Sequence, residues 1–128
     1  MLNTSINRFL SDGEHMLKKL KLVFDTFKYQ NRVALIWRPH PLLEATIRSI
    51  RPDLLEEYRS LTADFMDSHI GIWDDTQDIT NTVALADGYI GEDATSVVNL
   101  FMAAGKPVLF LIISLQAVLR RRKSSGLR

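Results

Sequence analysis

The chain has 128 residues, a formal net charge of +1 and no cysteine. This length fits one domain with a buried core, and the balanced charge gives no reason to expect a nucleic-acid partner. Because the chain has no cysteine, disulfides and cysteine-ligated metal sites are excluded. The N-terminus lacks a signal-peptide pattern, and the longest apolar run, near residues 108–119, is shorter than the roughly 20 residues of a membrane-spanning helix. We therefore expect a cytoplasmic protein.

Helical and extended patterns alternate along the chain, which is typical of βα units around a parallel sheet. Ser11-Asp12-Gly13-Glu14 is a capping box that predicts the start of the first helix, Pro52 suits the first turn of another helix, and Asp78 can cap a third. The expected helices cover residues 11–27, 43–50, 52–65, 79–86 and 96–104. The expected strands cover residues 33–37, 69–73, 89–90 and 107–113.

The alternation predicts an α/β fold: a single Rossmann-like, three-layer domain over residues 1–128, with a short parallel sheet and a polar tail at residues 120–128. Such a domain normally opens with a strand, but only Met1 and Leu2 precede the polar residues 3–5. The first strand is therefore expected to be missing or cut to its last residues, as in part of a larger protein. A sheet edge left incomplete in this way could drive self-association.

The first expected strand ends in Arg-Pro-His-Pro at residues 38–41. The prolines stiffen this turn, and ligands of open α/β sheets lie at the carboxyl ends of the strands. His40 could hold a phosphate oxygen or act as a general acid that protonates a leaving phosphate, while the alternative is a turn histidine bonded to the backbone. Arg38 offers a fork suited to a phosphate, but it could equally pair with Asp74 or Asp75.

A second strand end, at residues 91–96, leads into a helix through Asp93, Thr95 and Ser96. The free amides and the positive end of the helix dipole attract anions there, and the hydroxyls add donors. The alternative is that Thr95 or Ser96 only caps the helix. Glu92 and Asp93 would repel a phosphate, so one of them is expected to orient a ribose, a base or a neighbouring side chain. The two strand ends together predict an anionic ligand, either a phosphate or a diphosphate.

The acidic set Asp74, Asp75 and Asp78 raises the question of a divalent metal ion. Three carboxylates on one loop are more often solvated turn and cap residues, and the sequence places no histidine at ligand spacing from them. We therefore expect no metal site and no cofactor.

Three segments resemble a known family. WRPHPL, DDTQDI and ALADGYIGEDATSVVNLFMAAGKPVLFL are similar, in this order, to the nucleotide-binding half of the CDP-glycerol:glycerophosphotransferases, which are teichoic-acid polymerase relatives with the GT-B glycosyltransferase architecture. The residues that match the motifs of that family are His40 with Pro41, Asp78 with Ile79, Asp93 with Thr95 and Ser96, and Gly105-Lys106-Pro107. Thr4 and Ser5 are similar to the polar loop after the first strand of that half.

The resemblance implies a donor site for a nucleotide diphosphate such as CDP-glycerol. In this site His40 would contact the diphosphate or assist its departure. Thr95 and Ser96 would hold the phosphates, and Asp93 would support their loop. The substrate-binding residues that the resemblance implies are Arg38, Asp78, Asp93, Thr95, Ser96, Thr4 and Ser5.

By the same resemblance, the full-length enzyme would transfer glycerol phosphate or a related unit to a cell-surface polymer precursor, and it could associate peripherally with the membrane. This chain alone would form one wall of a two-domain cleft, so we expect it to bind nucleotide weakly and to turn over little or nothing. The alternatives are a non-catalytic nucleotide-binding or interaction module, an inactive fragment, and another GT-B glycosyltransferase or sugar-nucleotide epimerase relative.

Overall fold

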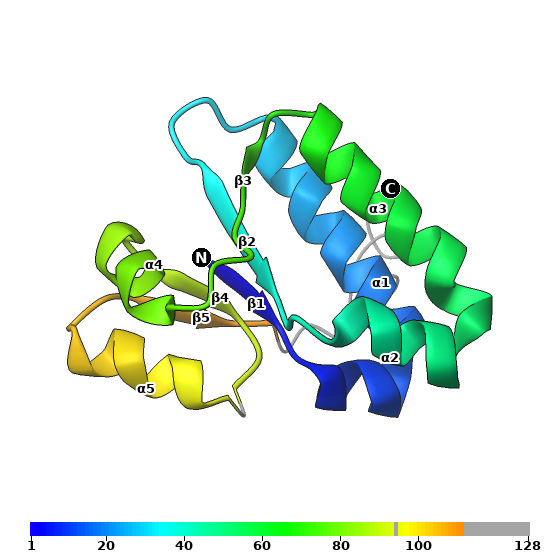
Figure 1. Cartoon of the computed structure of the whole chain (residues 1–128). Coiled ribbons are helices and arrows are strands. Elements are labelled where there is room, and N and C mark those ends of the chain that lie inside the picture. Colours follow the sequence, from blue (N-terminus) through cyan, green and yellow to red (C-terminus); the bar gives the residue numbers. More distant parts are fainter. Residues whose placement is uncertain (94, 112–128) are drawn as a thin grey trace, which may run out of the picture.

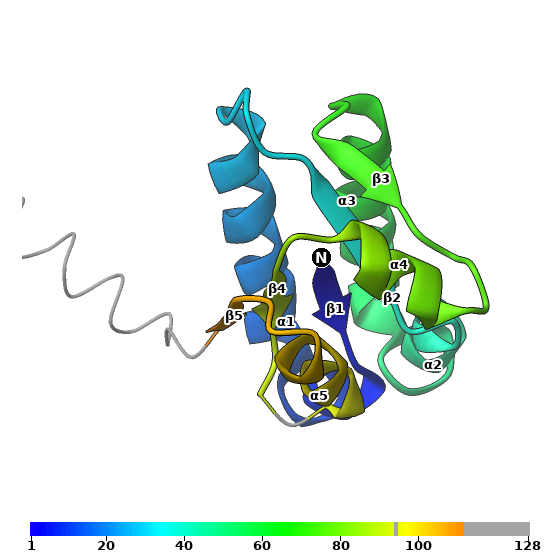
Figure 2. The same cartoon turned by 90° about the vertical axis from the view of Figure 1, so that its left-hand side faces the viewer.

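The computed structural model describes residues 1–93 and 95–111, and within them five strands form one parallel sheet in the order β3-β2-β1-β4-β5. The strands are β1 (Leu2–Thr4), β2 (Leu35–Pro39), β3 (Gly71–Trp73), β4 (Tyr89–Gly91) and β5 (Val108–Phe110). The helices are α1 (Ile6–Lys28), α2 (Leu43–Ile50), the 3-10 turn η1 (Pro52–Leu54), α3 (Leu55–Asp67), α4 (Ile79–Leu85) and α5 (Ser96–Ala103). Helices α1, α2 and α3 cover one face of the sheet, and α4 and α5 cover the other (Figures 1 and 2). The prediction of a Rossmann-like, three-layer α/β domain is confirmed.

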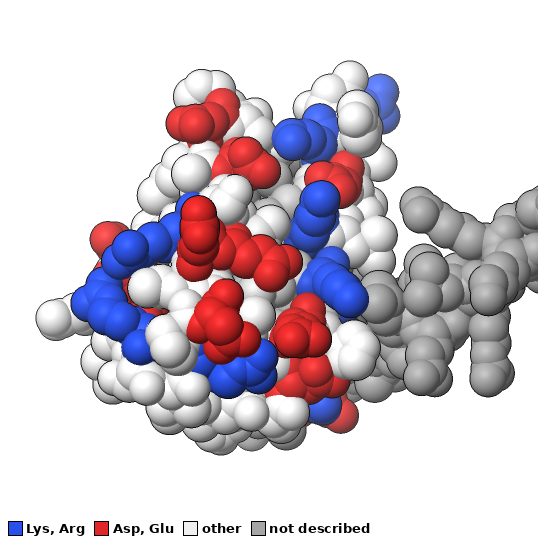
Figure 3. All heavy atoms as spheres, turned by 90° about the vertical axis from the view of Figure 1, so that its right-hand side faces the viewer, with Lys and Arg blue, Asp and Glu red and all other residues white. Residues whose placement is uncertain are grey.

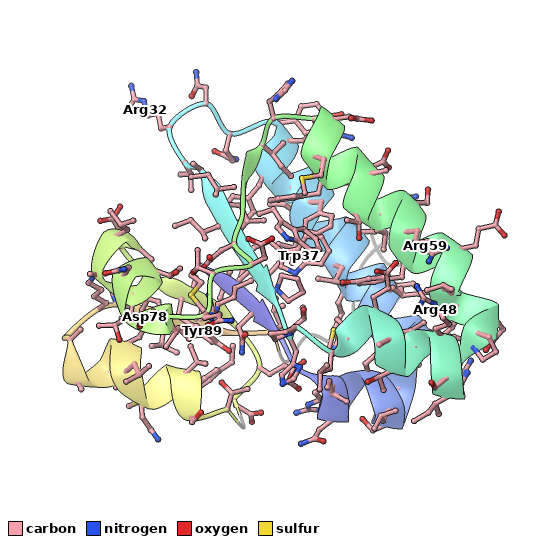
Figure 4. The ribbon with its side chains drawn as sticks, viewed as in Figure 1. Arg32, Trp37, Arg48, Arg59, Asp78 and Tyr89 are labelled. Carbon is pink, nitrogen blue, oxygen red and sulfur yellow. The ribbon has the colours of Figure 1, made fainter. Side chains whose placement is uncertain are left out.

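Strand β2 supplies side chains to both layers, because successive residues of a strand point to opposite faces. In β2, Leu35 and Trp37 enter the larger core beneath α1 and α3, whereas Ile36 packs against the smaller core beneath α4 and α5. Trp37 is fully buried, and its ring centroid lies 4.8 Å from that of Phe24 and 5.3 Å from that of Phe65 (Figure 4). These contacts hold β2 against α1 and α3, which fixes the position of its carboxyl end.

Strand β1 lies at the centre of the sheet, although it has only three residues. Leu2 is fully buried and pairs with Trp37 of β2 on one side and with Ile90 of β4 on the other. A short first strand is therefore part of the sheet, and its carboxyl end comes between those of β2 and β4.

The first helix begins earlier than the capping box predicts. Helix α1 starts at Ile6, where the Ser5 hydroxyl accepts a hydrogen bond from the Arg8 N–H at 3.4 Å. The capping box falls instead on a kink, where Asp12 has non-helical φ and ψ of −159° and 69° and its carboxylate bonds the ring of His15. The predicted start was wrong because Ser5 begins the helix about one and a half turns earlier without a distinctive pattern, and the Ser11 hydroxyl donates to the Arg8 carbonyl oxygen instead of capping a helix.

Strand β2 extends two residues beyond its predicted end, so Arg38 and Pro39 belong to the sheet and pair with Asn3 and Thr4. The other predicted helices and strands agree with the observed ones to within three residues at each described boundary. Residues 112–113 of the last predicted strand and the predicted tail at 120–128 lie outside the described residues. In the described part of the chain, the search for a helix long and apolar enough to cross a membrane finds none.

Candidate functional site

The carboxyl ends of four neighbouring strands bring together the predicted site residues. The predicted site residues lie at or just after these ends: residues 4–5 at the end of β1, 38–40 at the end of β2, 74–78 after β3 and 92–96 after β4. Between β1 and β4 the covering helix changes from α1 on one face to α5 on the other (Figure 2). This is the topological switch point, outside which open α/β sheets bind their ligands.

His40 is exposed in the turn between β2 and α2, and its ring is bonded to the backbone. Its Nδ1 accepts the N–H of Leu42 at 3.1 Å, so the predicted alternative of a turn histidine is realised. Because Nδ1 is an acceptor, the neutral ring carries its proton on Nε2, which can donate to a ligand. The Nε2 side of the ring is therefore the side that a ligand can contact.

A cleft of about 470 Å³ opens beside His40, between the ends of β2 and β3 and the helices α2 and α3. This volume is within the range of small-molecule sites. Its lining includes the aromatic residues Tyr58, which is buried, and Trp73, the last residue of β3. Burial raises the pKa of the Tyr58 hydroxyl to about 12, so this group stays neutral.

Two further lining residues, Glu44 and Arg59, had no signal in the sequence. The Arg59 Nε donates to Glu44 Oε1 at 2.8 Å and so joins α3 to α2 at the edge of the cleft (Figure 4). Other pairs of opposite charge, such as Arg51 with Asp53, also lie on this side of the molecule. Basic and acidic side chains interleave over the outer face of these helices (Figure 3), in keeping with the near-neutral charge of the chain.

Arg38 forms an ion pair with Asp74, one of the two alternatives predicted for it. Its Nη1 donates to Asp74 Oδ2 at 2.8 Å and to the Thr76 hydroxyl at 3.2 Å. Asp74 also accepts from the Thr76 amide at 3.0 Å and from the Thr82 hydroxyl. Burial alone would raise the pKa of the Asp74 carboxyl, but these donors outweigh burial and lower the pKa to about 2. The guanidinium therefore holds the loop between β3 and α4 in place.

Asp78 caps α4, as predicted, because its Oδ1 accepts the Thr80 N–H at 2.8 Å. This hydrogen bond lowers the pKa of the Asp78 carboxyl. Asp75 is exposed and lines the cleft beside His40. Within residues 1–93 and 95–111, no group of three or more histidine, aspartate or glutamate side chains lies close enough to hold a metal ion.

At the switch point, Ser5 and Glu92 join β1 to the end of β4. The Ser5 hydroxyl donates to the Glu92 carboxylate and also caps α1. Thr4 is buried, and its hydroxyl accepts the Trp37 Nε1–H at 3.4 Å, so it is not exposed to a ligand. Asp93 is half-exposed and pairs with Arg8 at 3.2 Å. Both acidic residues contact neighbouring side chains, which is one of the roles predicted for them.

The start of α5 differs from those of α1 and α4, but, like the start of α2, it has no side-chain cap in the described structure. Its N-cap residue, Thr95, makes no side-chain capping hydrogen bond to any described residue, and its hydroxyl lies 3.5 Å from that of Tyr89. Ser96, the first residue of the helix, is exposed. By contrast, the Ser5 side chain caps α1 and the Asp78 side chain caps α4.

His40 and the start of α5 lie at the same edge of the sheet but not in one cleft. Strand β1 lies between β2 and β4, so the two strands that lead to these positions are two strand spacings apart, about 10 Å. The residues described as lining the His40 cleft include neither Thr95 nor Ser96. A ligand that contacts both positions must therefore extend across the end of β1.

Lys106, which belongs to the Gly-Lys-Pro match, lies away from this edge. Its Nζ donates to the carbonyl oxygens of Val83, Ala84 and Ala86 at 2.6, 3.0 and 2.7 Å. The ammonium group thus satisfies carbonyls at the end of α4 and neutralises the negative end of its dipole. The residue has a structural role that the motif alone did not indicate.

Comparison of the chain with family models, with curated proteins and with solved structures finds no match. The class of protein is therefore defined by the structure: a Rossmann-like α/β domain with polar side chains gathered at the carboxyl edge of its sheet.

Proposed function

We propose that this domain binds the diphosphate of a nucleotide-linked donor at the start of α5. In this proposal it is the donor-binding half of a GT-B-type transferase that moves glycerol phosphate or a related unit from a CDP-linked donor during cell-surface polymer synthesis. The resemblance at His40, Asp78, Asp93 and Thr95-Ser96 suggests the donor class.

The observation that carries the proposal is the uncapped start of α5. The first amides of a helix need acceptors, and together with the helix dipole they favour an anion. Thr95 supplies no side-chain cap in the described structure, its carbonyl oxygen accepts the Val98 N–H at 3.3 Å, and the Ser96 hydroxyl beside the first two amides is exposed. This helix start also borders the switch point, where ligands of such sheets bind.

In this proposal His40 contacts the other end of the same donor. A nucleotide diphosphate with its transferred group is long enough to extend from α5 across the end of β1. The Nε2–H of His40 then donates to a phosphate or hydroxyl oxygen of the donor, and the cleft beside it receives the part that projects past β2. Arg38 acts indirectly, because its side chain holds Asp74.

Calorimetric titration with CDP and CDP-glycerol tests the proposal. Saturable binding should weaken in both Ser96→Ala and His40→Ala, and it should be unchanged in Ser60→Ala, an exposed serine on α3. Loss of one charge-assisted hydrogen bond should cost about tenfold in affinity. Binding untouched by both site variants, or no binding at millimolar ligand, overturns the proposal. Equal affinity for UDP would favour another GT-B relative, and binding without turnover in any reconstituted system would favour a non-catalytic module.

A further inference from the structure

The cleft between α2, α3 and the ends of β2 and β3 has an aromatic wall that the core holds in place. Trp73, at the end of β3, is partly buried and lines the cleft. Its ring centroid lies 4.9 Å from that of the fully buried Trp37, and the two rings are inclined by 78°. Tyr58, which also lines the cleft, packs on the same core ring with a centroid distance of 6.2 Å. The Trp73 indole thus offers a fixed apolar surface to a ligand.

The charges around this cleft nearly cancel. The Asp74 carboxylate, which lines the cleft, is paired with Arg38 at 2.8 Å. Glu44 and Arg59 line it as a second ion pair, also at 2.8 Å. Asp75 is exposed, and none of the ion pairs among the described residues includes it. A phosphate in the cleft would meet this carboxylate without an unpaired guanidinium or ammonium group among the described lining residues to offset it.

The hydrogen-bonding groups of the cleft include both acceptors and donors. The carboxylates of Asp75 and Glu44 only accept. The His40 ring presents its Nε2 side, because Nδ1 accepts the Leu42 N–H, and Arg59 has N–H groups besides the Nε that is bonded to Glu44. A cationic ligand would use the acceptors alone, and a cytosine base has a single amino group for two separate carboxylates. Hydroxyl groups both donate and accept, so several hydroxyls on one ligand can bond all of these side chains.

We propose that this cleft binds an uncharged, hydroxyl-rich group, either a glycerol unit or a sugar ring. Its hydroxyls bond Asp75, Glu44 and His40, and its C–H groups pack against the Trp73 indole. The class of ligand follows from the cleft itself, whereas the attachment of this group to a nucleotide donor rests on the proposed function. The cleft then selects the group that the donor carries, and the phosphates stay outside it.

The test is an NMR titration of the 15N-labelled chain, followed at the indole N–H of Trp73. Glycerol and methyl α-D-glucopyranoside are the uncharged probes, and inorganic phosphate and tetramethylammonium, at matched ionic strength, are the charged ones. At least one uncharged probe should shift the indole signal saturably, and the tighter of the two identifies the preferred group as glycerol or a sugar ring. Neither charged probe should shift it saturably.

Asp75→Ala should weaken binding of the uncharged probe at least about tenfold, because hydrogen bonds to a charged acceptor are lost. Asp67→Ala, which removes an exposed aspartate of α3 that does not line the cleft, is the matched control and should leave the affinity unchanged. The spectrum before titration confirms that each variant is folded. The inference is overturned by the absence of a saturable shift up to the solubility limit of both uncharged probes, by tighter binding of a charged probe, or by an unchanged affinity in Asp75→Ala.

Failure of this inference is distinguishable from failure of the proposed function. If CDP shifts the amides of residues 96–98 but neither uncharged probe shifts the Trp73 indole, the donor site stands and the cleft does not bind a hydroxyl-rich group. If an uncharged probe binds the cleft while CDP shifts nothing at residues 96–98, the cleft stands as a binding site and the donor site does not.

Discussion

The starts of α1 and α5 lie on either side of the switch point, yet their first backbone N–H groups meet different hydrogen-bond acceptors. At α1, Ser5 supplies the cap and Glu92 adds a buried carboxylate. At α5, the Thr95 side chain makes no capping hydrogen bond to any residue that the structure describes. The two helices start at the same edge of the sheet, but only α1 has a side-chain cap and a buried carboxylate beside it in the described structure. The comparison teaches that two helices in similar positions of one fold can have their first amides satisfied by different groups.

The largest effect on stability should come from breaking the hydrogen-bond network of Asp74, which holds the loop between β3 and α4. Asp74→Ala removes the partner of Arg38, whose side chain is only 13% exposed, and should lower the free energy of unfolding by about 3 kcal/mol. Urea denaturation measures this loss. Asp75→Ala, an exposed neighbour, is the control and should change stability by less than about 0.5 kcal/mol. A small effect of Asp74→Ala would mean that this region is held mainly by packing.

The same network should make stability depend on acid. The pKa of the Asp74 carboxyl is lowered from 3.8 to about 2 in the folded chain, so its contribution is fully present above about pH 4 and is lost as the pH falls toward 2. The contribution should be about 2 kcal/mol, since each pKa unit corresponds to about 1.4 kcal/mol. Urea midpoints between pH 5 and pH 2 should fall less steeply in Asp74→Asn than in the wild type. Parallel slopes would contradict the prediction.

The comparison of the two helix starts predicts that replacing the N-cap residue by alanine lowers the free energy of unfolding more at α1 than at α5. Ser5→Ala removes a cap and a donor to Glu92, and should cost about 1 kcal/mol or more. Thr95→Ala removes no capping hydrogen bond in the described structure and should cost less than about 0.5 kcal/mol. Thermal unfolding of both variants gives the difference. Equal losses would show that Thr95 serves α5 as Ser5 serves α1.

The smallest effect on stability should come from adding a side-chain cap to α5. Thr95→Asp places a carboxylate where it can cap α5, and should raise the free energy of unfolding by about 0.5 kcal/mol. The same change should abolish CDP binding, because the carboxylate takes the place of a phosphate. Thr95→Asn caps without a charge, and it separates blocking by charge from blocking by the hydrogen bond. Undiminished CDP binding in Thr95→Asp would place the phosphates elsewhere.

The fold class and most helices and strands could be predicted, because their signals are local. The cap at Asp78, the proline at the start of η1 and the apolar runs of β2 and β4 need no knowledge of distant residues. The start of α1 was missed because Ser5 caps it without a distinctive pattern around it.

The site could be predicted only in part, because its decisive contacts join residues far apart in the chain. Sequence placed Arg38 and Asp74 at neighbouring strand ends but could not choose between an ion pair and a phosphate contact. The link from Ser5 to Glu92 spans 87 positions and has no local signal. The place of the buried Tyr58 at the edge of a cleft depends on how α3 packs over β2, which no local pattern in the sequence indicates.

The three carbonyl oxygens that accept hydrogen bonds from the Lys106 ammonium group should also slow the acylation of this amine. An acylating reagent needs a neutral, free amine, and Lys106 must release all three acceptors before it can react. In a time course of acetylation followed by peptide mass spectrometry, this position should be modified more slowly than Lys18 and Lys21, which are exposed on α1. The lag would report how often the end of α4 separates from the segment that leads into β5.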